Sequence, residues 1–528
     1  MAEAVTGFQA GQKSLRQYAR EMDIPYETLR FWLKRYDQIS GAPEVKAFFE
    51  SPAGVVFLHL LLIALHVCFT KIGAASIRNI TSFLKYTGLD QFVAGSVGSQ
   101  HSFSKQIDEQ ICGFGHEETQ RMAAQMPEKL ICVAEDETFH PDKMCLVVIE
   151  PVSNYIVLEC YAEKRDSATW TRLVTEALDG LDVKVVWQTS DEAKGLRHHA
   201  TVGLGATHAP DLFHIQQELV KGTSRALASQ LAQAEQKHRE LMAKWPQPKP
   251  GTDKRLRFDP SPEDQAQLLE AGMELALAYI RRHRVKKSRR SISDAYNPYD
   301  IFTGEPQTAQ TVSSKLERAF EEIATVTTHL GEFCHKRIAK AKRLIPEVAA
   351  TITQYFAIIS LIVKDATESE ILRQQLVSAL IPGYYLLEAA RKEKNNKRRQ
   401  TIVDRASALL HPFHQRAGPF ACLDDSEIAH FEKKVLECVG LFQRSSSCVE
   451  GRNAHLARYH RGFHRLSDLR LSALTVLHNF HIRRSDETTP AQRFFECEHG
   501  DLFQWLVKHI ELPSRPHNRK KNAASTAA

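Results

Sequence analysis

Apolar residues in the first half of the chain gather in short runs that turn residues separate. Residues 131–138, 144–150 and 155–161 are rich in Val, Ile, Leu, Cys and Tyr, and two polar, proline-containing segments stand between them. This composition is typical of β-strands joined by turns. Residues 167–181 then place apolar side chains at helical spacing, and residues 183–189 form a continuous apolar run. The pattern predicts a three-stranded meander, a helix and a fourth strand.

The order of these elements predicts how the strands meet. A strand reached through a crossover helix lies parallel to the sheet, so a central first strand and the fourth strand end side by side. This is the chain path of the ribonuclease H-like fold, in a protein of the α+β class. It brings Asp136 and Asp191 to one point at the edge of the sheet. Glu135 and Glu137 flank Asp136, but strand alternation turns both to the opposite face.

The N-terminal residues 14–36 predict two helices joined by a tight turn. The apolar side chains expected to pack between the helices are Leu15, Tyr18, Ala19, Leu29, Trp32 and Leu33. Arg30, Lys34 and Arg35 are left on the outer face of the second helix. This spacing is that of a helix-turn-helix, whose second helix enters a DNA major groove. An ordinary helical hairpin has the same pattern and is the alternative.

Most of the remaining chain is helical by periodicity. Residues 74–111 predict a second pair of helices, which is either another DNA-binding unit or helical scaffold. Residues 208–214 predict a short strand that leads into a helix at 215–244. Residues 245–264 are polar and Pro-rich, as in a linker, and residues 265–443 are almost wholly helical.

Composition excludes several classes of protein. An apolar share of 43% and a charged share of 25% are ordinary for soluble globular chains, and 528 residues predict three or four domains. The longest apolar run, residues 55–69, contains two histidines, which favours a buried helix over a membrane span. The ten cysteines form no CxxC pair, which favours reduced thiols in a cytoplasmic protein over zinc or disulfides.

Charge is more informative in its distribution than in its sum. The net charge is only +6, but basic residues come in blocks at 281–290, 391–399 and 515–521. Such blocks suit a phosphate-rich partner, and a solvated helix face is the alternative for each one. They favour an inserted helical domain whose basic edges face double-stranded DNA.

A third acid stands in a basic, serine-rich segment near the C-terminus. Residues 445–447 are serines that can cap a helix, and Glu450 falls in its first turn. Three arginines surround it, and we expect them to hold phosphates: Arg444, Arg452 and Arg458. Glu437 and Asp425 are rival third acids in less basic surroundings.

Clustered carboxylates suit a particular chemistry. Hard divalent cations such as Mg²⁺ or Mn²⁺ prefer oxygen ligands. Two such ions can activate an attacking oxygen and stabilise a leaving oxygen at phosphorus. His214 and Asp211 follow close behind the expected site, where either would touch metal or substrate. A buried histidine and a helix-capping aspartate are the structural alternative for this pair.

Four motifs in order resemble a known family: VAEDET, QTSDEAKGL, DLFHIQQEL, and SSSCVEGRN followed by HNFHIRR. Over about residues 131–499 the chain resembles the catalytic core of bacterial insertion-sequence DDE transposases, close to an unclassified group with a helical insertion before the last acid. The resemblance implies that Asp136, Asp191 and Glu450 are catalytic and hold Mg²⁺ or Mn²⁺, as two ions. It implies cleavage at transposon ends and strand transfer into target DNA.

This interpretation divides the chain into six parts: a helix-turn-helix (1–45), a helical region (46–125), the first part of the core (126–245), a linker and helical insertion (246–443), the last part of the core (444–512) and a basic disordered tail (513–528). It also implies a homodimer or larger assembly on DNA, no membrane association, and a place with the bacterial nucleoid in the cytoplasm. Two other functions stay open. One is a former transposase that only binds DNA as a regulator, and the other is a ribonuclease H-like nuclease or junction resolvase.

Overall fold

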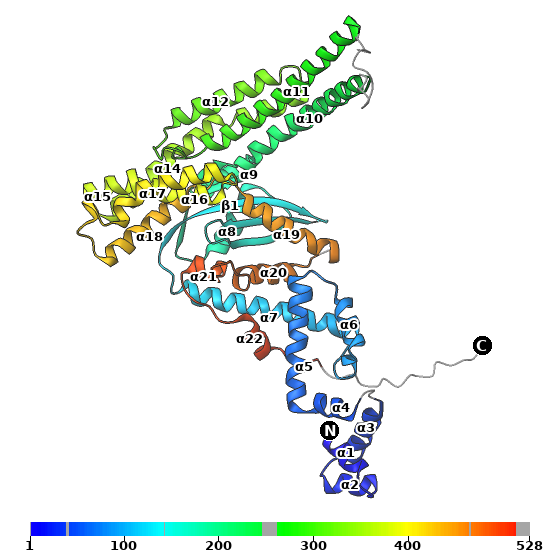
Figure 1. The fold of residues 1–528 in the computed structure, drawn as a ribbon. Helices are drawn as coiled ribbons and strands as arrows, with labels where there is room; N and C mark the ends of the chain where they lie inside the picture. The colour runs from blue at the N-terminus through cyan, green and yellow to red at the C-terminus, as the bar shows by residue number, and fades with distance from the viewer. Residues whose placement is uncertain (1, 39–41, 142, 245–260, 464–465, 514–528) are drawn as a thin grey trace.

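The computed structural model describes residues 2–38, 42–141, 143–244, 261–463 and 466–513. It combines one five-stranded mixed sheet with layers of helices above and below it (Figure 1). The α+β class expected from the sequence is confirmed. Most of the expected linker (245–260) and the basic tail (514–528) lie outside the described residues.

The sheet has the strand order β3-β2-β1-β4-β5. The strands are β1 (Lys129–His140), β2 (Lys143–Glu150), β3 (Tyr155–Ala162), β4 (Val183–Ser190) and β5 (Thr207–Pro210). β1 pairs antiparallel with β2 and parallel with β4, and β4 pairs parallel with β5. The crossover helix α8 (Ser167–Leu178) joins β3 to β4 and is capped by Asp166, whose side chain accepts from the Thr169 N–H. The predicted meander, crossover helix and central first strand are therefore confirmed.

The fifth strand is shorter than the sequence pattern predicts. β5 ends at Pro210, and α10 (Leu212–Lys244) begins two residues later. The carboxylate of Asp211 accepts the backbone N–H of Phe213 at 2.7 Å, as the side chain of an N-cap residue does. The prediction of a strand through His214 was wrong, because this cap starts the helix earlier. His214 lies in the first turn of α10.

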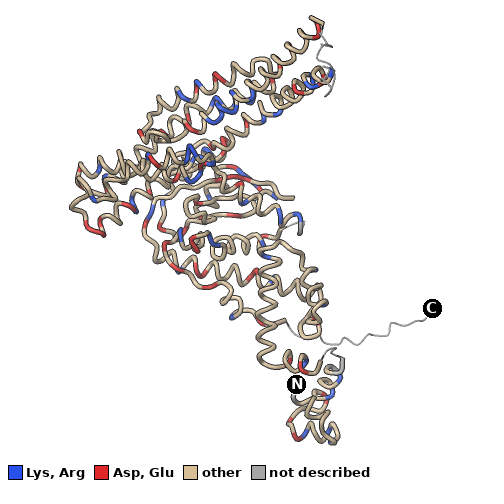
Figure 2. The backbone as a smooth tube through the Cα atoms, in the orientation of Figure 1, with Lys and Arg blue, Asp and Glu red and all other residues tan. Residues whose placement is uncertain are grey.

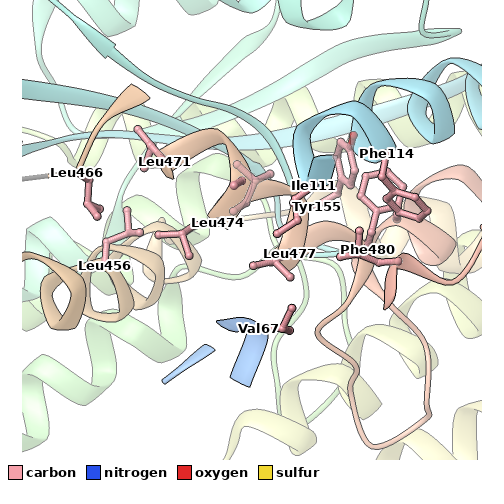
Figure 3. Close-up of a cluster of buried hydrophobic side chains, with 14 of the residues drawn as sticks. Val67, Ile111, Phe114, Tyr155, Leu456, Leu466, Leu471, Leu474, Leu477 and Phe480 are labelled. Atoms are coloured by element: carbon pink, nitrogen blue, oxygen red, sulfur yellow. The ribbon is translucent and has the colours of Figure 1, made fainter. Parts of the chain in front are cut away.

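Two hydrophobic cores hold the sheet between its helical layers. The larger core packs β1–β3 and α8 against the N-terminal helices and the four C-terminal helices α19 (Ser447–Phe463), α20 (Asp468–Phe480), α21 (Pro490–Phe495) and α22 (Leu502–His509). Figure 3 shows Leu471, Leu474, Leu477 and Phe480 of α20 beside Ile111 and Phe114 of α7 (Val97–Ala123) and Tyr155 of β3. The second core packs Cys132 of β1 and Trp187 of β4 against the helices of residues 212–442.

The N-terminal helices are α1 (Ala2–Gln9), α2 (Leu15–Glu21), α3 (Tyr26–Gln38), α4 (Pro43–Glu50), α5 (Pro52–Leu65), the π-helix η1 (His66–Ile72), α6 (Ile77–Tyr86), the 3₁₀ turn η2 (Leu89–Gln91) and α7 (Val97–Ala123). The predicted packing of α2 on α3 is confirmed, because Ala19 and Leu29 are buried with the other four predicted side chains around them. The sequence reading missed α1, whose Ala4 joins the same cluster.

Between β4 and α19 the described chain is helical apart from β5 and an isolated bridge between Tyr299 and Pro306. The helices are α9 (Lys194–His198), η3 (His199–Gly203), α10, α11 (Pro262–Ala295), α12 (Ala309–Val326), α13 (Glu332–Lys342), α14 (Ile345–Ala366), α15 (Glu370–Gln375), η4 (Leu376–Leu380), α16 (Ile381–Lys392), α17 (Asn396–His414), η5 (Gly418–Phe420) and α18 (Asp425–Leu441). α11 begins inside the expected linker because Ser261 caps it and Pro262 occupies its first position. The helices α10, α11 and α12 project from the body as an arm (Figure 1).

Two helical stretches, Pro52–Ile72 and Glu332–Ala366, are long and apolar enough to cross a membrane by length and composition. Both contribute to the protein cores, the first through Leu58, Leu62 and Ile63 and the second through residues such as Ile352 and Tyr355. Each therefore has a structural role of the kind that core helices have in soluble proteins.

Candidate active site

Two of the three expected acids lie at matching positions on neighbouring parallel strands. The last pair in the β1–β4 register joins Ala134 to Thr189, and Asp136 and Asp191 each stand two residues beyond it. Asp136 is still inside β1, opposite Val147 of β2, and is only 9% exposed. Asp191 directly follows β4, where its carboxylate accepts the N–H of Ala193 at 2.9 Å. The sequence prediction that strand ends bring these acids together is consistent with this register.

The third acid is placed by a segment that is tied to β4 and to the start of α10. The carbonyl of Gln443 accepts the Trp187 indole N–H at 2.7 Å and the Thr189 hydroxyl at 2.9 Å. The carbonyl of Arg444 accepts the Leu212 N–H at 2.8 Å. These three hydrogen bonds fix the approach to α19, which contacts β1 and β2 and carries Glu450 in its first turn. Figure 1 shows α19 running beside the sheet close to β1.

The serines before α19 act differently from the simple cap that the sequence suggests. The hydroxyl of Ser446 donates to the carboxylate of Asp211 at 2.5 Å, and both residues are fully buried. Only the weaker bond from the Ser447 N–H to the Ser445 hydroxyl, at 3.3 Å, has the character of a local cap. Ser446 therefore holds the start of α19 against the start of α10.

The charges of Asp191 and Glu450 both act on Asp136. Burial, together with the nearby charges of Glu450, Asp191 and Glu137, raises the pKa of Asp136 to about 7 against the opposing charge of His214. A carboxyl that is neutral or half-ionised at neutral pH is typical of a concentrated acidic site. Segments separated by hundreds of residues thus converge on Asp136.

His214 supplies a positive charge at this site. Burial alone would lower its pKa, but the hydrogen bond and charge of Asp211, with the charges of Asp136 and Asp191, outweigh burial and raise the pKa to about 9. The bond runs from Nδ1 to the Asp211 carboxylate at 2.9 Å. His214 is therefore an imidazolium at neutral pH, held by a buried aspartate that Ser446 also contacts.

The donor set suits a hard divalent cation in type and charge, because it consists of carboxylates whose repulsion a cation would relieve. Burial is the main cause of the raised pKa of Asp136, and repulsion from Glu450 and Asp191 adds to it. Among the residues that the structure describes, however, no three His, Cys, Asp or Glu side chains lie close enough together to hold a metal ion as they stand. The acids are within electrostatic range of each other without being arranged as a ligand set.

The neighbouring acids have other partners. Glu135 is fully buried on the opposite face, where Gln188 donates to it at 2.8 Å and His199 lies 3.3 Å away. Glu137 forms an ion pair with Arg165. The opposite-face prediction is confirmed for Glu135. The rival third acids, Asp425 and Glu437, pair with Arg416 and Lys434 respectively, and neither figures among the main influences on the pKa of Asp136.

Two of the three arginines around Glu450 have structural partners rather than free guanidinium groups. Arg452 is buried and makes a bidentate ion pair with Glu159 of β3, at 2.7 and 2.6 Å. Arg444 donates to the carbonyls of Ser293 and Tyr296 at the end of α11, at 2.6 and 2.5 Å. The expectation that Arg452 holds phosphate was wrong, because this side chain is buried and paired with Glu159. Arg458 is exposed and contacts His455.

The basic residues of α3 lie on the protein surface. Arg30 and Lys34 are exposed, and Arg30 makes only a long 3.4 Å ion pair with Glu27 of its own helix. The side chain of Arg35 lies outside what the structure describes. Their outward placement is what a DNA-reading helix needs, and it is equally what any solvated helix face shows.

Sequence reasoning missed a small cavity beside Asp191. A space of about 40 Å³ is lined by Asp191, Glu192, His214, Glu218 and Lys340, among others. Burial raises the pKa of Glu192, and one of its carboxylate oxygens is buried without a hydrogen-bond partner among the described residues. Its position next to Asp191 was the available sequence signal. Lys340 comes from α13, and nothing in the sequence connects it to the site.

Comparison with known families reaches only the C-terminal part of the chain. Residues 376–522 match a family of unknown function (DUF6399). The match includes Glu450 and its helix α19, but it begins at residue 376, well after β1 and β4 with Asp136 and Asp191. No curated protein matches the chain.

Proposed function

We propose that the protein is a transposase of the DDE class, which cleaves DNA at transposon ends and joins the freed end to target DNA. The observation that carries the proposal is the convergence of Asp136, Asp191 and Glu450 on one edge of a sheet with the order β3-β2-β1-β4-β5. This order, with β2 antiparallel and β4 and β5 parallel to β1, is the expected order of a ribonuclease H-like core. The long helical segment between Asp191 and Glu450 fits the insertion that the sequence resemblance implies.

Asp136, Asp191 and Glu450 would hold Mg²⁺ or Mn²⁺, as two ions. When bound, such ions activate an attacking oxygen and stabilise the leaving oxygen at phosphorus. The residues of the chain position the substrate. The imidazolium of His214 offers a charge-assisted hydrogen bond to a phosphate oxygen, while the Asp211 carboxylate fixes its orientation.

The N-terminal helices supply the second half of the proposal. We assign α2 and α3 to recognition of the transposon end, with Arg30, Lys34 and Arg35 facing DNA. Cutting two ends together requires at least two active sites, so the proposed working form is a homodimer or larger assembly on DNA. Its proposed place is the bacterial cytoplasm, with the nucleoid.

The test is cleavage of a labelled duplex that carries the terminal sequence of the protein's own element, with Mg²⁺ or Mn²⁺. We expect metal-dependent nicking at the end, and we expect Asp191→Asn to abolish nicking while it binds the duplex as the intact protein does. A protein that binds the end but never nicks it under any divalent cation would overturn the enzymatic proposal.

A second candidate function is that of a former transposase that has become a sequence-specific DNA-binding regulator. The exposed Arg30 and Lys34 of α3 would serve that function equally well. Binding without nicking in the same experiment would support this function. A ribonuclease H-like nuclease or resolvase would nick DNA but would not join the 3′ end to a second duplex, so a strand-transfer product separates it from a transposase.

A further inference from the structure

A large cavity lies in the helical arm, away from the candidate active site. It is a half-open groove of about 590 Å³ between α11, α12 and the segment that joins them. Its floor includes Ala295, Ile301 and Ala319, and its rim is charged. Figure 2 shows lysines and arginines gathered along this arm. Charged side chains dominate the rim of this groove, so the way they pair decides which ligand the groove can bind.

Three acids line the groove, and each is neutralised by a partner. Glu322 pairs with Arg284 at 2.5 Å, and Asp300 pairs with Lys315 at 2.9 Å. Asp294 pairs at 2.8 Å with Arg398, which reaches it from α17. Arg398 also lies over the ring of Phe302 on the groove wall. These ion pairs neutralise the three carboxylates of the rim and hold their side chains in place.

Two basic side chains of the rim have no acidic partner among the residues that the structure describes. Lys287 of α11 and Arg318 of α12 are both exposed, and within the described chain neither side chain makes a hydrogen bond or ion pair. The charge of Lys287 helps to lower the pKa of Glu322, but the carboxylate of Glu322 is bound by Arg284. The hydroxyl of Ser291 adds a hydrogen-bonding group beside Lys287. The groove therefore has two unneutralised positive charges on opposite walls, as a ligand with several negative charges requires.

The groove is joined to the candidate active site through the end of α11. Asp294 and Ala295 line its inner end, and the flanking carbonyls of Ser293 and Tyr296 hold Arg444. Arg444 stands six residues before Glu450, in the segment tied to β4 and α10. The C-terminal end of α11 therefore connects the groove to the segment that carries Glu450.

We propose that this groove binds the phosphate backbone of duplex DNA next to the cleaved position, with Lys287 and Arg318 as its phosphate contacts. This assignment rests on the proposed function for the identity of the DNA, but the charges of the groove are independent of the catalytic acids. The proposal also gives different roles to the basic residues of the block at 281–290. Arg284 and Arg290 serve ion pairs, Arg289 donates to Gln216, and Lys287 faces the ligand.

The experiment measures the affinity of the full chain for a short fluorescent duplex by anisotropy, in EDTA so that no cleavage occurs, over a range of salt concentrations. The variant is Lys287→Gln with Arg318→Gln. The matched control is Arg282→Gln with Lys286→Gln, which removes the same charge from exposed positions of the same arm outside the groove. Circular dichroism and gel filtration confirm that both variants fold.

Loss of two phosphate contacts reduces the slope of log affinity against log salt by roughly 1.8, and it lowers affinity on the order of 50-fold near 0.1 M salt. We expect this for the groove variant and a much smaller change for the control. Equal changes in both variants, or none in either, would overturn the proposal.

A second experiment distinguishes DNA from a small phosphate ligand. Inorganic pyrophosphate is titrated calorimetrically into the intact protein and the groove variant. Tight pyrophosphate binding that the variant loses, with unchanged DNA affinity, would replace DNA by a small phosphorylated ligand and overturn the assignment. Failure of the proposed function gives a different result. If the intact protein never cuts DNA, but the groove variant binds DNA more weakly and with a smaller salt dependence, the groove remains a DNA-binding site.

Discussion

The buried ion pair between Arg452 and Glu159 makes a strong prediction, because α19 carries Glu450 two residues before this arginine. Arg452 is 4% exposed and Glu159 is 7% exposed. Burial alone would raise the pKa of Glu159, but Arg452 and the Thr475 hydroxyl hold it below its ordinary value. Removing one partner of such a pair leaves an unpaired buried charge and costs about 3–5 kcal/mol. We expect Arg452→Ala to lower the free energy of unfolding by that amount.

The assay is urea unfolding of the full chain, followed by tryptophan fluorescence, with the double variant Glu159→Leu, Arg452→Met as the comparison. Replacing both partners by apolar side chains removes the unpaired charge, so we expect it to recover most of the loss. A cost for Arg452→Ala below about 1 kcal/mol would refute the reasoning, since that is the cost of an exposed ion pair. In the folded variant the salt slope of DNA binding should be unchanged, because Arg452 does not reach phosphate.

Three other predictions concern charge. Burial lowers the pKa of His66 to about 4, whereas the unfolded chain accepts this proton near pH 6.5. The free energy of unfolding should therefore fall as pH drops from 6.5 toward 4, by about 3 kcal/mol at most from this group. Urea unfolding at several pH values measures the fall. Asp136→Asn should raise the melting temperature while it abolishes cleavage, because it removes a carboxylate from a repulsive site. Arg30→Ala with Lys34→Ala should weaken binding to the transposon end and reduce its salt slope by roughly 1.8.

Each of these has a contrary result and a control. His66→Gln should reduce the acid sensitivity, and an unchanged pH profile in that variant would show that other groups control it. A lower melting temperature in Asp136→Asn would mean that the carboxylate stabilises its surroundings. Unchanged affinity in the α3 variant would move end recognition away from this helix, and Lys13→Ala, at an exposed position before α2, is the matched control.

The sheet could be predicted from sequence because its signals are local. Val, Ile and Cys fill the strands, turn residues separate them, and one crossover helix fixes the direction of β4. These features also brought Asp136 and Asp191 to one edge. Glu450 needed more than local pattern, since its place depends on Gln443 and Arg444 bonding to β4 and α10 across the whole insertion.

Long-range contacts also explain the errors. The end of β5 depends on the capping carboxylate of Asp211, which a strand pattern does not reveal. Arg452 has the sequence surroundings of a phosphate contact, but its partner Glu159 lies 293 positions earlier on β3. Glu192, Lys340 and the groove between α11 and α12 are assembled by packing alone. Charge and periodicity indicated a basic helical arm, and they did not show which of its cations are already paired.

The most direct test of the central claim compares Glu450→Gln with Glu437→Gln in Mg²⁺-dependent cleavage and strand transfer on the terminal sequence. Both variants lose one carboxylate from neighbouring helices, but Glu437 pairs with Lys434, whereas Glu450 influences Asp136. We predict that Glu450→Gln binds the end normally and neither cuts nor joins it, while Glu437→Gln retains both activities. Full activity in Glu450→Gln would contradict the account, because it would remove the third acid from the site that the fold assembles.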